Sequence, residues 1–240
     1  MTIEEFEVFF KKYLDKLNIN LNNQQILKFF KYMNILIEWN KKINLTAITD
    51  PEEIVVKHFI DSLTISKYIK ENSKLIDVGT GAGFPGIPLK IYRNDIDVTL
   101  LDSLNKRVNF LDYVIKELNL EEIKAIHGRA EEYAHTIEYR EKFDIATSRA
   151  VANMTTLSEY LIPYVKVKGN VIAMKGPDAN EEIENAKNAI KVLGAKVISI
   201  EEFNLPYTKI SRNIVLIEKL KLTSSKYPRK PGTPTKDPLK

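Results

Sequence analysis

The feature that most constrains the fold is a change in the spacing of apolar residues near residue 73. From there, short apolar runs alternate with amphipathic helical patterns. Helical spacing is clear at Asn105–Leu118 and Ala179–Leu193, between the apolar runs. Repeated strand–helix–strand units predict a mostly parallel sheet with helices on both faces. The candidate strands are Lys74–Val78, Asp97–Leu101, Ile123–His127, Phe143–Ala146, Asn170–Met174, Ala195–Ile200 and Asn213–Glu218.

The last two candidate strands are joined by EEFNLPYTKISR, which is too short to contain a crossover helix. Strands joined so directly pair antiparallel. The expected fold is therefore α/β and Rossmann-like, with a seven-stranded sheet that is parallel except for one reversed edge strand.

The first 72 residues show helical periodicity instead. Apolar residues recur every three or four positions through IEEFEVFFKKYLDKL and again from Gln24 to Trp39. Asn22 and the pair Asp50-Pro51 are helix start signals. We therefore expect a helical cap at 1–72, a main α/β domain at 73–222, and a basic, proline-rich tail at 223–240.

Bulk composition excludes several classes of protein. The 240 residues include no cysteine, which excludes disulfides, thiolate metal sites and a cysteine nucleophile. No apolar run approaches a membrane span, and the acidic start MTIEEFEVFF is unlike a signal peptide. We expect a cytoplasmic protein, without membrane association and monomeric. The net charge of +4 is concentrated in the tail, which is either a solvated terminus or a contact for a polyanion.

A glycine-rich segment, LIDVGTGAGFPGIPL at residues 75 to 89, follows the first candidate strand directly. In open α/β sheets this position binds ligands, and glycine lets a ligand approach the main chain. The pattern from Gly81 to Gly86 fits G-x-G-x-x-G, which alone is compatible with NAD, FAD or a nucleoside cofactor. Asp77 precedes the first glycine and would repel a pyrophosphate by about 4 kcal/mol at 4 Å. A cofactor with a cationic head, such as S-adenosylmethionine, is favoured instead.

Four further candidate residues fall at the ends of candidate strands. Asp102, after the second strand, can bind both ribose hydroxyls or cap the next helix. Ala130 and Glu131, after the third, lie where an adenine would be, although Glu131 can equally be a first-turn helix acid. Arg149, after the fourth, can hold a carboxylate or phosphate, or form an ordinary surface salt bridge.

Short motifs, which occur in sequence order along almost the whole chain, resemble the ribosomal RNA small-subunit methyltransferase G family, formerly called glucose-inhibited division protein B. These motifs are Trp39-Asn40, Asn44-Leu45-Thr46, His58, Asp61-Ser62-Leu63, Asp77–Gly86, Leu101-Asp102-Ser103, Arg129-Ala130-Glu131, Ser148-Arg149-Ala150, Met174-Lys175-Gly176 and Tyr227–Gly232.

The resemblance implies a class I methyltransferase that transfers a methyl group from S-adenosylmethionine to N7 of one guanine in 16S ribosomal RNA or the small ribosomal subunit. It also implies that the cofactor contacts Gly79, Phe84, Asp102, Ser103, Leu104, Ala130, Glu131 and Arg149. No metal is expected. Guanine N7 has a free lone pair, so positioning alone suffices and no catalytic base is expected. The three histidines, His58, His127 and His135, lack metal-ligand spacing.

Three alternatives remain open at this stage. The first is a methyltransferase acting on another RNA site, a small molecule or a protein. The second is a nicotinamide-dependent dehydrogenase, which Asp77 disfavours. The third is an RNA-binding protein whose nucleotide pocket is vestigial, which the intact glycines disfavour. Arg149, Lys175 and the basic tail are candidate RNA contacts, while His58 and Asp61 would share one helix face.

Overall fold

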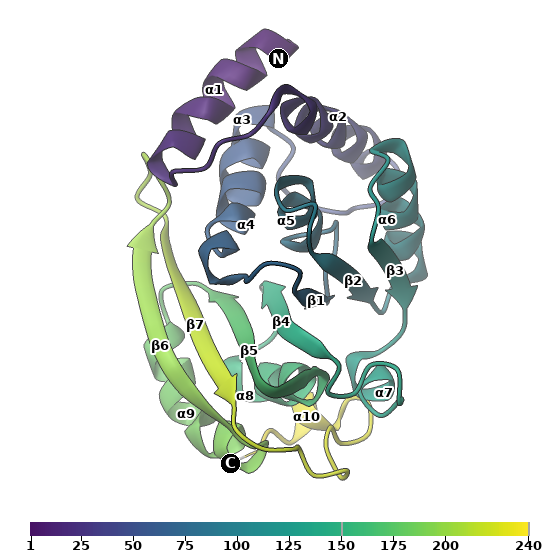
Figure 1. Ribbon diagram of the computed structural model, residues 1–240, viewed down its shortest axis with the longest axis vertical. Coiled ribbons are helices and arrows are strands. Elements are labelled where there is room, and N and C mark those ends of the chain that lie inside the picture. The colour runs from purple at the N-terminus through teal and green to yellow at the C-terminus, as the bar shows by residue number, and fades with distance from the viewer. Residues whose placement is uncertain (150, 240) are drawn as a thin grey trace.

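The protein, seen in a computed structural model that describes residues 1–149 and 151–239, is built on one seven-stranded sheet (Figure 1). The strand order is β3-β2-β1-β4-β5-β7-β6. Among the described strands, β7 alone runs opposite to the others, which confirms the predicted mostly parallel sheet with an antiparallel edge. The reversed strand is second from the edge, because β7 lies between β5 and the edge strand β6. The strands are β1 (Lys74–Val78), β2 (Asp97–Asp102), β3 (Ile123–His127), β4 (Phe143–Arg149), β5 (Val165–Lys175), β6 (Ala195–Asn204) and β7 (Ser211–Lys219).

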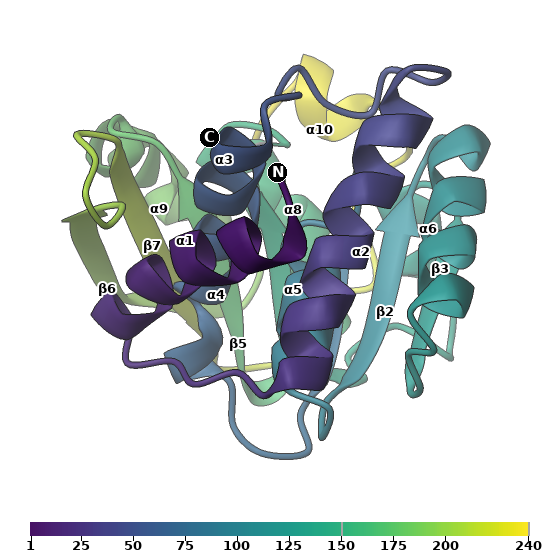
Figure 2. The same cartoon turned by 90° about the horizontal axis from the view of Figure 1, so that it is seen from above.

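Helices cover both faces of this sheet (Figures 1 and 2). One face carries α1 (Ile3–Lys16), α2 (Asn23–Asn40), α3 (Pro51–Ile54), α4 (Asp61–Leu63), α5 (Gly86–Tyr92) and α6 (Asn105–Glu117). The opposite face carries α8 (Met154–Leu161), α9 (Ala179–Val192) and α10 (Thr233–Lys236), while α7 (Ala130–Tyr133) follows β3. Short 3-10 turns occur at Ser66–Tyr68 and Ile162–Tyr164.

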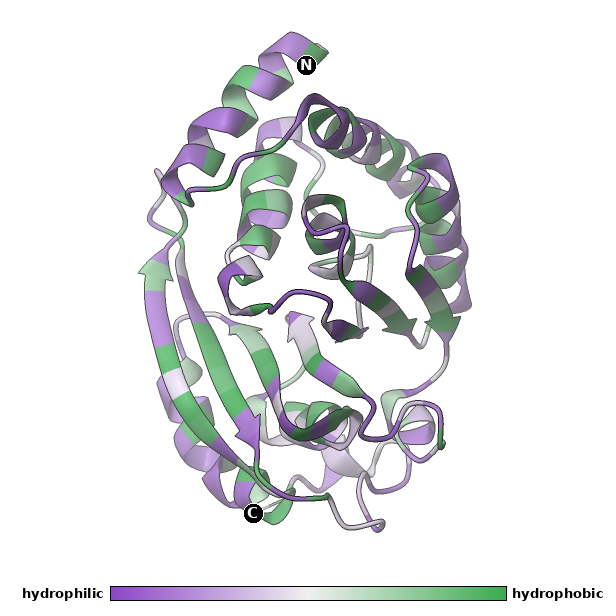
Figure 3. Cartoon of the chain, viewed as in Figure 1, coloured by the Kyte–Doolittle hydropathy of each residue, from purple (hydrophilic) through white to green (hydrophobic). Residues whose placement is uncertain are grey.

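Alternation along the strands divides the interior into two hydrophobic cores. Leu75 packs into the core under α1 to α6, whereas its neighbour Ile76 packs into the core under α8 and α9. The helices of residues 1–72 belong to the first core, so they share it with the sheet. Helices α2 and α6 turn their apolar sides inward and their polar sides to solvent (Figure 3). The domain boundary near residue 72 stays a prediction.

The predicted helix starts are present. The Asn22 side chain accepts from the N–H of Gln25 at 2.9 Å, and the Asp50 carboxylate accepts from the N–H of Glu53 at 2.9 Å. The helix that begins at Pro51 continues to Leu63 through a π-helical stretch at Val55–Ile60. A π-helical stretch often marks a functional position in a helix, and this one contains His58.

Three strands extend beyond the sequence prediction by three or more residues at one end, while β2 and β7 extend by only one or two residues at an end. Strand β4 reaches Arg149 rather than Ala146, because the hydroxyls of Thr147 and Ser148 donate to the carbonyls of Ile172 and Val78. Strand β5 begins at Val165 and β6 ends at Asn204, in polar, half-exposed segments without the continuous apolar run that signalled the strand centres. Ala150 and Lys240, assigned above to a motif and to the tail, lie outside the described residues.

Candidate active site

The glycine-rich loop connects the end of β1 to α5 and lies close against β2. Gly79 has φ +70°, and its N–H donates to the carbonyl of Leu101 at 2.8 Å. A Cβ on Gly86 would stand 2.3 Å from Leu100 and 3.0 Å from Asp77 Oδ2. Glycine is therefore required for backbone conformation at the first position and for close packing at the second. The loop is held at the carboxyl end of the sheet, as predicted.

Asp77 is fully buried beneath this loop. Its Oδ2 accepts hydrogen bonds from Thr80 Oγ1 at 2.6 Å and from the N–H of Gly86 at 2.9 Å. Its Oδ1 has no hydrogen-bond partner among the described residues. Burial raises the pKa of this carboxyl to about 6, although the two hydrogen bonds and Arg149 act in the opposite direction. A buried carboxylate oxygen without a partner is unusual, and a cationic ligand is the kind of group that would satisfy it.

Asp102 joins the first loop to the turn after β2. Its Oδ2 accepts from the N–H of Gly81 at 2.9 Å, and its Oδ1 accepts from the N–H of Leu104 at 2.9 Å. It does not cap α6, whose N-cap position is Leu104. A carboxylate has about four acceptor sites, so the predicted ribose contact remains compatible with these bonds. That contact stays a prediction.

A cavity of about 190 Å³ opens beside Gly79 at the ends of β1 to β3. Four of the predicted cofactor contacts line it: Gly79, Ser103, Ala130 and Glu131. This volume is smaller than the ~300–1,000 Å³ of typical ligand pockets. Val151 narrows one side, since its Cγ2 lies 2.7 Å from where a Cβ on Gly79 would stand. The other lining residues are Val78, Leu101, Gly128, Arg129, Tyr160, Gly232 and Thr235.

The other four predicted cofactor contacts, Phe84, Asp102, Leu104 and Arg149, do not line this cavity. The ring of Phe84 stacks on His58 with centroids 4.3 Å apart, and the Arg149 guanidinium lies 5.1 Å from the centroid of the same ring. The Arg149 side chain is only 15% exposed, so the alternative of an ordinary surface salt bridge is wrong. Their cofactor contacts remain predictions.

Arg149 instead binds the helix that contains the π-helical stretch. Its Nη1 donates to Asp61 Oδ2 at 3.1 Å, and its Nη2 donates to His58 Nδ1 at 3.0 Å. Burial and the nearby guanidinium lower the pKa of His58 to about 3. Arg212 Nε also donates to Asp61, at 3.1 Å, so this buried carboxylate lies between two guanidiniums. His58 and Asp61 thus meet the same arginine, which confirms that they share a face.

The C-terminal segment packs against the cavity. The N–H of Gly232 donates to Glu131 Oε1 at 2.9 Å, and Arg229 is paired with buried Glu159 at 2.8 Å. The alternative of a solvated tail therefore does not describe this segment. Lys175 is also engaged, because its Nζ donates to the carbonyl of Ala152 at 2.8 Å and pairs with Glu182 at 2.6 Å.

Several residues at the site were not found from the sequence. Tyr160, Gly232 and Thr235 complete the cavity, and Tyr32 of α2 donates to the carbonyl of Ala82 in the glycine loop. The Tyr227–Gly232 motif was the one available signal for the tail residues. A single tyrosine in a helical pattern is typical of a core residue. The sequence therefore does not indicate that Tyr32 or Tyr160 belongs to the site.

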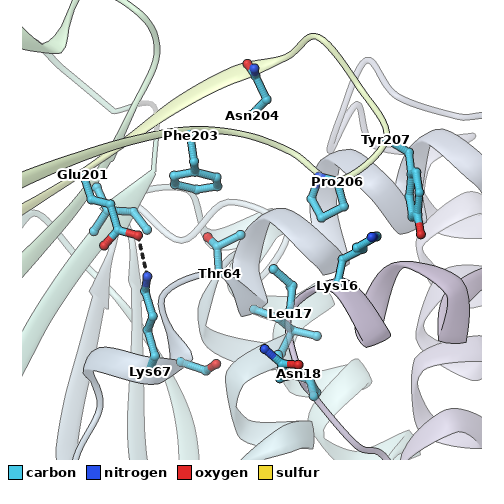
Figure 4. A pocket seen from close by; sticks show the side chains of 14 residues that line it. Lys16, Leu17, Asn18, Thr64, Lys67, Glu201, Phe203, Asn204, Pro206 and Tyr207 are labelled. Carbon is cyan, nitrogen blue, oxygen red and sulfur yellow. Dashed lines mark hydrogen bonds and ion pairs between the residues drawn. The ribbon is translucent and has the colours of Figure 1, made fainter.

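A second cavity, of about 470 Å³, lies between the end of α1, the end of α4 and the β6–β7 hairpin (Figure 4). Leu17, Thr64 and Phe203 line it, and Lys67 forms an ion pair with Glu201 at 2.5 Å across its edge. It contains no glycine loop and none of the predicted site residues. The candidate active site is therefore the cavity beside Gly79.

The described part of the chain has neither a metal-holding cluster nor a membrane-spanning helix. No group of three or more histidine, aspartate or glutamate side chains there could hold a metal ion. None of the helices there has both the length and the apolar character needed to cross a membrane.

Comparison with known proteins gives concordant results. Residues 25–215 match the family model described as rRNA small subunit methyltransferase G. The protein of that name from Alkaliphilus metalliredigens is 51% identical over 238 residues, which cover 98% of this chain and 100% of the relative. Its counterpart in Acetivibrio thermocellus is 55% identical over 222 residues, with 92% and 91% covered.

Solved structures share the fold at low sequence identity. M. jannaschii TYW2 in complex with AdoMet has a TM-score of 0.53 and 18% identity, covering 67% of this chain and 75% of that one. The methyltransferase in a complex with the Haloferax volcanii Trm112 activator has a TM-score of 0.56 and 11% identity, covering 78% and 98%. These likenesses extend to the fold alone.

Proposed function

The chain belongs to the ribosomal RNA small subunit methyltransferase G family, and from this premise we propose that it transfers a methyl group from S-adenosylmethionine to N7 of one guanine in 16S ribosomal RNA. Membership supports ribosomal RNA as the substrate. The resemblance described above contributes the guanine and its N7 atom. The cytoplasm, where ribosomal RNA is modified in bacteria, is the proposed location.

The observation that carries the cofactor assignment is the unpartnered Oδ1 of Asp77, a buried carboxylate under the glycine loop that does not line the cavity and would act on the cofactor through its charge. Bound S-adenosylmethionine would supply an activated methyl group on a cationic sulfur, together with an ammonium group. An anionic carboxylate favours such a cation and opposes a diphosphate. TYW2, which shares the fold, is described in complex with AdoMet, and this adds support.

Residues in and beside the cavity would bind different parts of the cofactor. Gly79 would present bare backbone to the cofactor, and the segment from Gly128 to Glu131 would contact the adenine; both line the cavity. Asp102 does not line the cavity, but it accepts from the N–H of Gly81 beside it and would bind the ribose. Phe84 and Arg149 form a buried layer with His58 beneath the helical cap. That layer fixes the end of β4 relative to the cap.

The proposed reaction needs no proton acceptor in the protein. Guanine N7 carries a lone pair and no hydrogen, so alignment and exclusion of water suffice. His58 is the histidine nearest Arg149, and with a pKa of about 3 it is neutral at physiological pH. Its Nδ1 is already occupied by the Arg149 donor, which supports a positioning role over proton transfer.

The decisive experiment is methyl transfer from labelled cofactor to 16S ribosomal RNA and to small subunits, followed by mass spectrometry of the nucleosides. We expect one N7-methylguanosine. RNA transcribed with 7-deazaguanosine keeps its base pairing but has carbon in place of N7, so it should accept no methyl group. Methylation of that RNA, or appearance of a different methylated nucleoside, would overturn the assignment of N7.

A further inference from the structure

The C-terminal segment from Tyr227 to Lys236 lies outside the part of the chain matched by the family model, which ends at residue 215. Nevertheless, Gly232 and Thr235 line the cavity beside Gly79. We propose that this segment is the outer wall of the cofactor cavity and that Arg229 is the residue that positions it. This inference rests on the proposed function, which places the cofactor in that cavity.

The strongest anchor is the pair of Arg229 with Glu159 of α8. Arg229 donates from its main-chain N–H to Oε1 at 2.7 Å and from Nη2 to Oε2 at 2.8 Å, and its Nε lies 3.0 Å from Oε1. Glu159 is 1% exposed, and within the described residues its carboxylate is bound by Arg229 alone. Such a multiple contact between a guanidinium and a buried carboxylate fixes both position and orientation.

The wall itself is attached at three more points. Gly232, at φ +81°, donates its N–H to buried Glu131 of α7 at 2.9 Å. The hydroxyls of Tyr160 and Thr235 lie 3.0 Å apart, and Thr156 donates to the carbonyl of Pro234 at 3.0 Å. The segment therefore bridges α7 and α8, the two helices on either side of the cavity.

The chain leading to this wall is also held along its length. Arg140 donates to the carbonyls of Thr223 at 2.7 Å and of Tyr227 at 2.8 Å. His135 Nε2 lies 2.7 Å from the carbonyl of Pro228. The C-terminal segment is therefore part of the structure that forms the cavity, and in this proposal it contributes to binding of the cofactor.

The chemistry explains why the wall and the site depend on each other. Without the segment, Glu131 would lose the N–H of Gly232 and Glu159 would lose the guanidinium of Arg229, the donors that satisfy their carboxylates in the folded protein. Glu131 is the residue expected beside the adenine, and Gly232 sets the direction of its Oε1. Loss of the wall would both expose this end of the cavity and release Glu131.

The test compares Arg229→Gln with Lys230→Gln in the full chain, using titration calorimetry with S-adenosylmethionine and no RNA. Each change removes one positive charge, but Lys230 is exposed and forms no ion pair with the described residues, whereas Arg229 is paired with buried Glu159. We expect Arg229→Gln to raise the Kd for the cofactor roughly tenfold, the size expected when a charged hydrogen bond is lost. Lys230→Gln should stay within twofold of the wild type, and Arg229→Lys should recover part of the affinity.

A purely structural role would lower the Tm of the cofactor-free protein and leave the Kd unchanged, and this result would overturn the inference. Should Arg229→Gln fail to fold, Thr235→Ala changes only the exposed rim of the wall and should raise the Kd several-fold. An unchanged Kd for Thr235→Ala would likewise overturn it. Failure of the wild type to bind the cofactor would instead refute the proposed function.

Discussion

Arg149 donates a hydrogen bond from Nη2 to Nδ1 of His58 at 3.0 Å, across the boundary between the sheet and the helical cap. The acceptor nitrogen must be unprotonated, so the proton of the neutral ring is on Nε2, which faces Thr46 Oγ1 at 2.9 Å. The imidazole therefore joins the end of β4 to two segments of the cap, those of Thr46 and of its own helix.

This arrangement makes His58 a source of acid sensitivity. Its pKa is lowered to about 3 in the folded protein, whereas an unfolded histidine has a pKa near 6.5. Its stabilising contribution is present above pH 6.5 and is lost as the pH falls, because only the unfolded chain then takes up the proton. Between pH 7.5 and 5.0 we expect the wild type to lose about 2 kcal/mol more free energy of unfolding than His58→Asn. Urea denaturation at both values measures the difference, and equal losses would contradict a buried neutral ring.

Asp77 should make cofactor binding depend on pH. Its pKa of about 6 means that the carboxyl is charged at pH 7.5 and largely neutral at pH 5. Because the attraction for a cationic ligand needs the charge, the Kd of the wild type should rise as the pH falls through 6. Asp77→Asn should bind roughly tenfold more weakly at pH 7.5 and lose this dependence, since a neutral amide offers no ionic attraction. Calorimetric titrations at the two values test both statements, and a steep pH dependence in the variant would count against Asp77.

The pKa of Asp77 also affects stability, in the direction opposite to that of His58. The folded-state value lies above the ordinary value of 3.8, so the folded protein holds this proton more tightly than the unfolded chain. The contribution to stability falls as the pH rises from about 4 to 6. Asp77 is common to the wild type and His58→Asn, so it cancels in the comparison above.

Asp102 should matter for cofactor affinity through two routes. The proposed function assigns it to the ribose, and it holds Gly81 and Leu104 in position through its two oxygens. Asp102→Ala should weaken binding of S-adenosylmethionine roughly tenfold or more, because a charged hydrogen bond is worth about 1.5–3 kcal/mol. Asp112→Ala, an exposed acid on α6, is the matched control and should leave the Kd unchanged. Unchanged affinity in Asp102→Ala would refute the ribose assignment.

Much of the fold could be predicted because its signals are local. Period-two and period-3.6 patterns, the caps at Asn22 and Asp50, and the glycines after β1 each act within a few residues. The extra length of β4 could not be predicted in this way. Thr147 and Ser148 look like residues beyond a strand end, and their burial is satisfied by carbonyls of β5 and β1 that are distant in sequence.

At the site, too, local signals were predictable from the sequence and contacts between distant residues were not. The positions of Gly79, Ala130 and Glu131 at the cavity were predictable because each follows a strand that ends at one edge of the sheet, whereas Ser103 was implied only by the family resemblance. Arg149 has the right position, but its partners His58 and Asp61 lie about ninety residues earlier, and only the folded chain brings them together. The sequence interpretation of the tail depended on its charge. Its contacts with Glu131 and Glu159 could not be predicted, because they depend on tertiary structure.

The tail's exposed lysines can be tested for RNA contact separately from its wall function. Lys226, Lys230 and Lys236 are exposed, while Arg229 is committed to Glu159. Changing the three lysines to glutamine should weaken binding to 16S ribosomal RNA and reduce the slope of log K against log salt by up to about 2, because each phosphate contact on a single strand contributes about 0.7. Cofactor affinity in the same variant should remain at the wild-type value, which separates the two roles. Filter binding over a range of salt concentrations provides the slope, and a slope equal to that of the wild type would show that these lysines do not contact the RNA backbone.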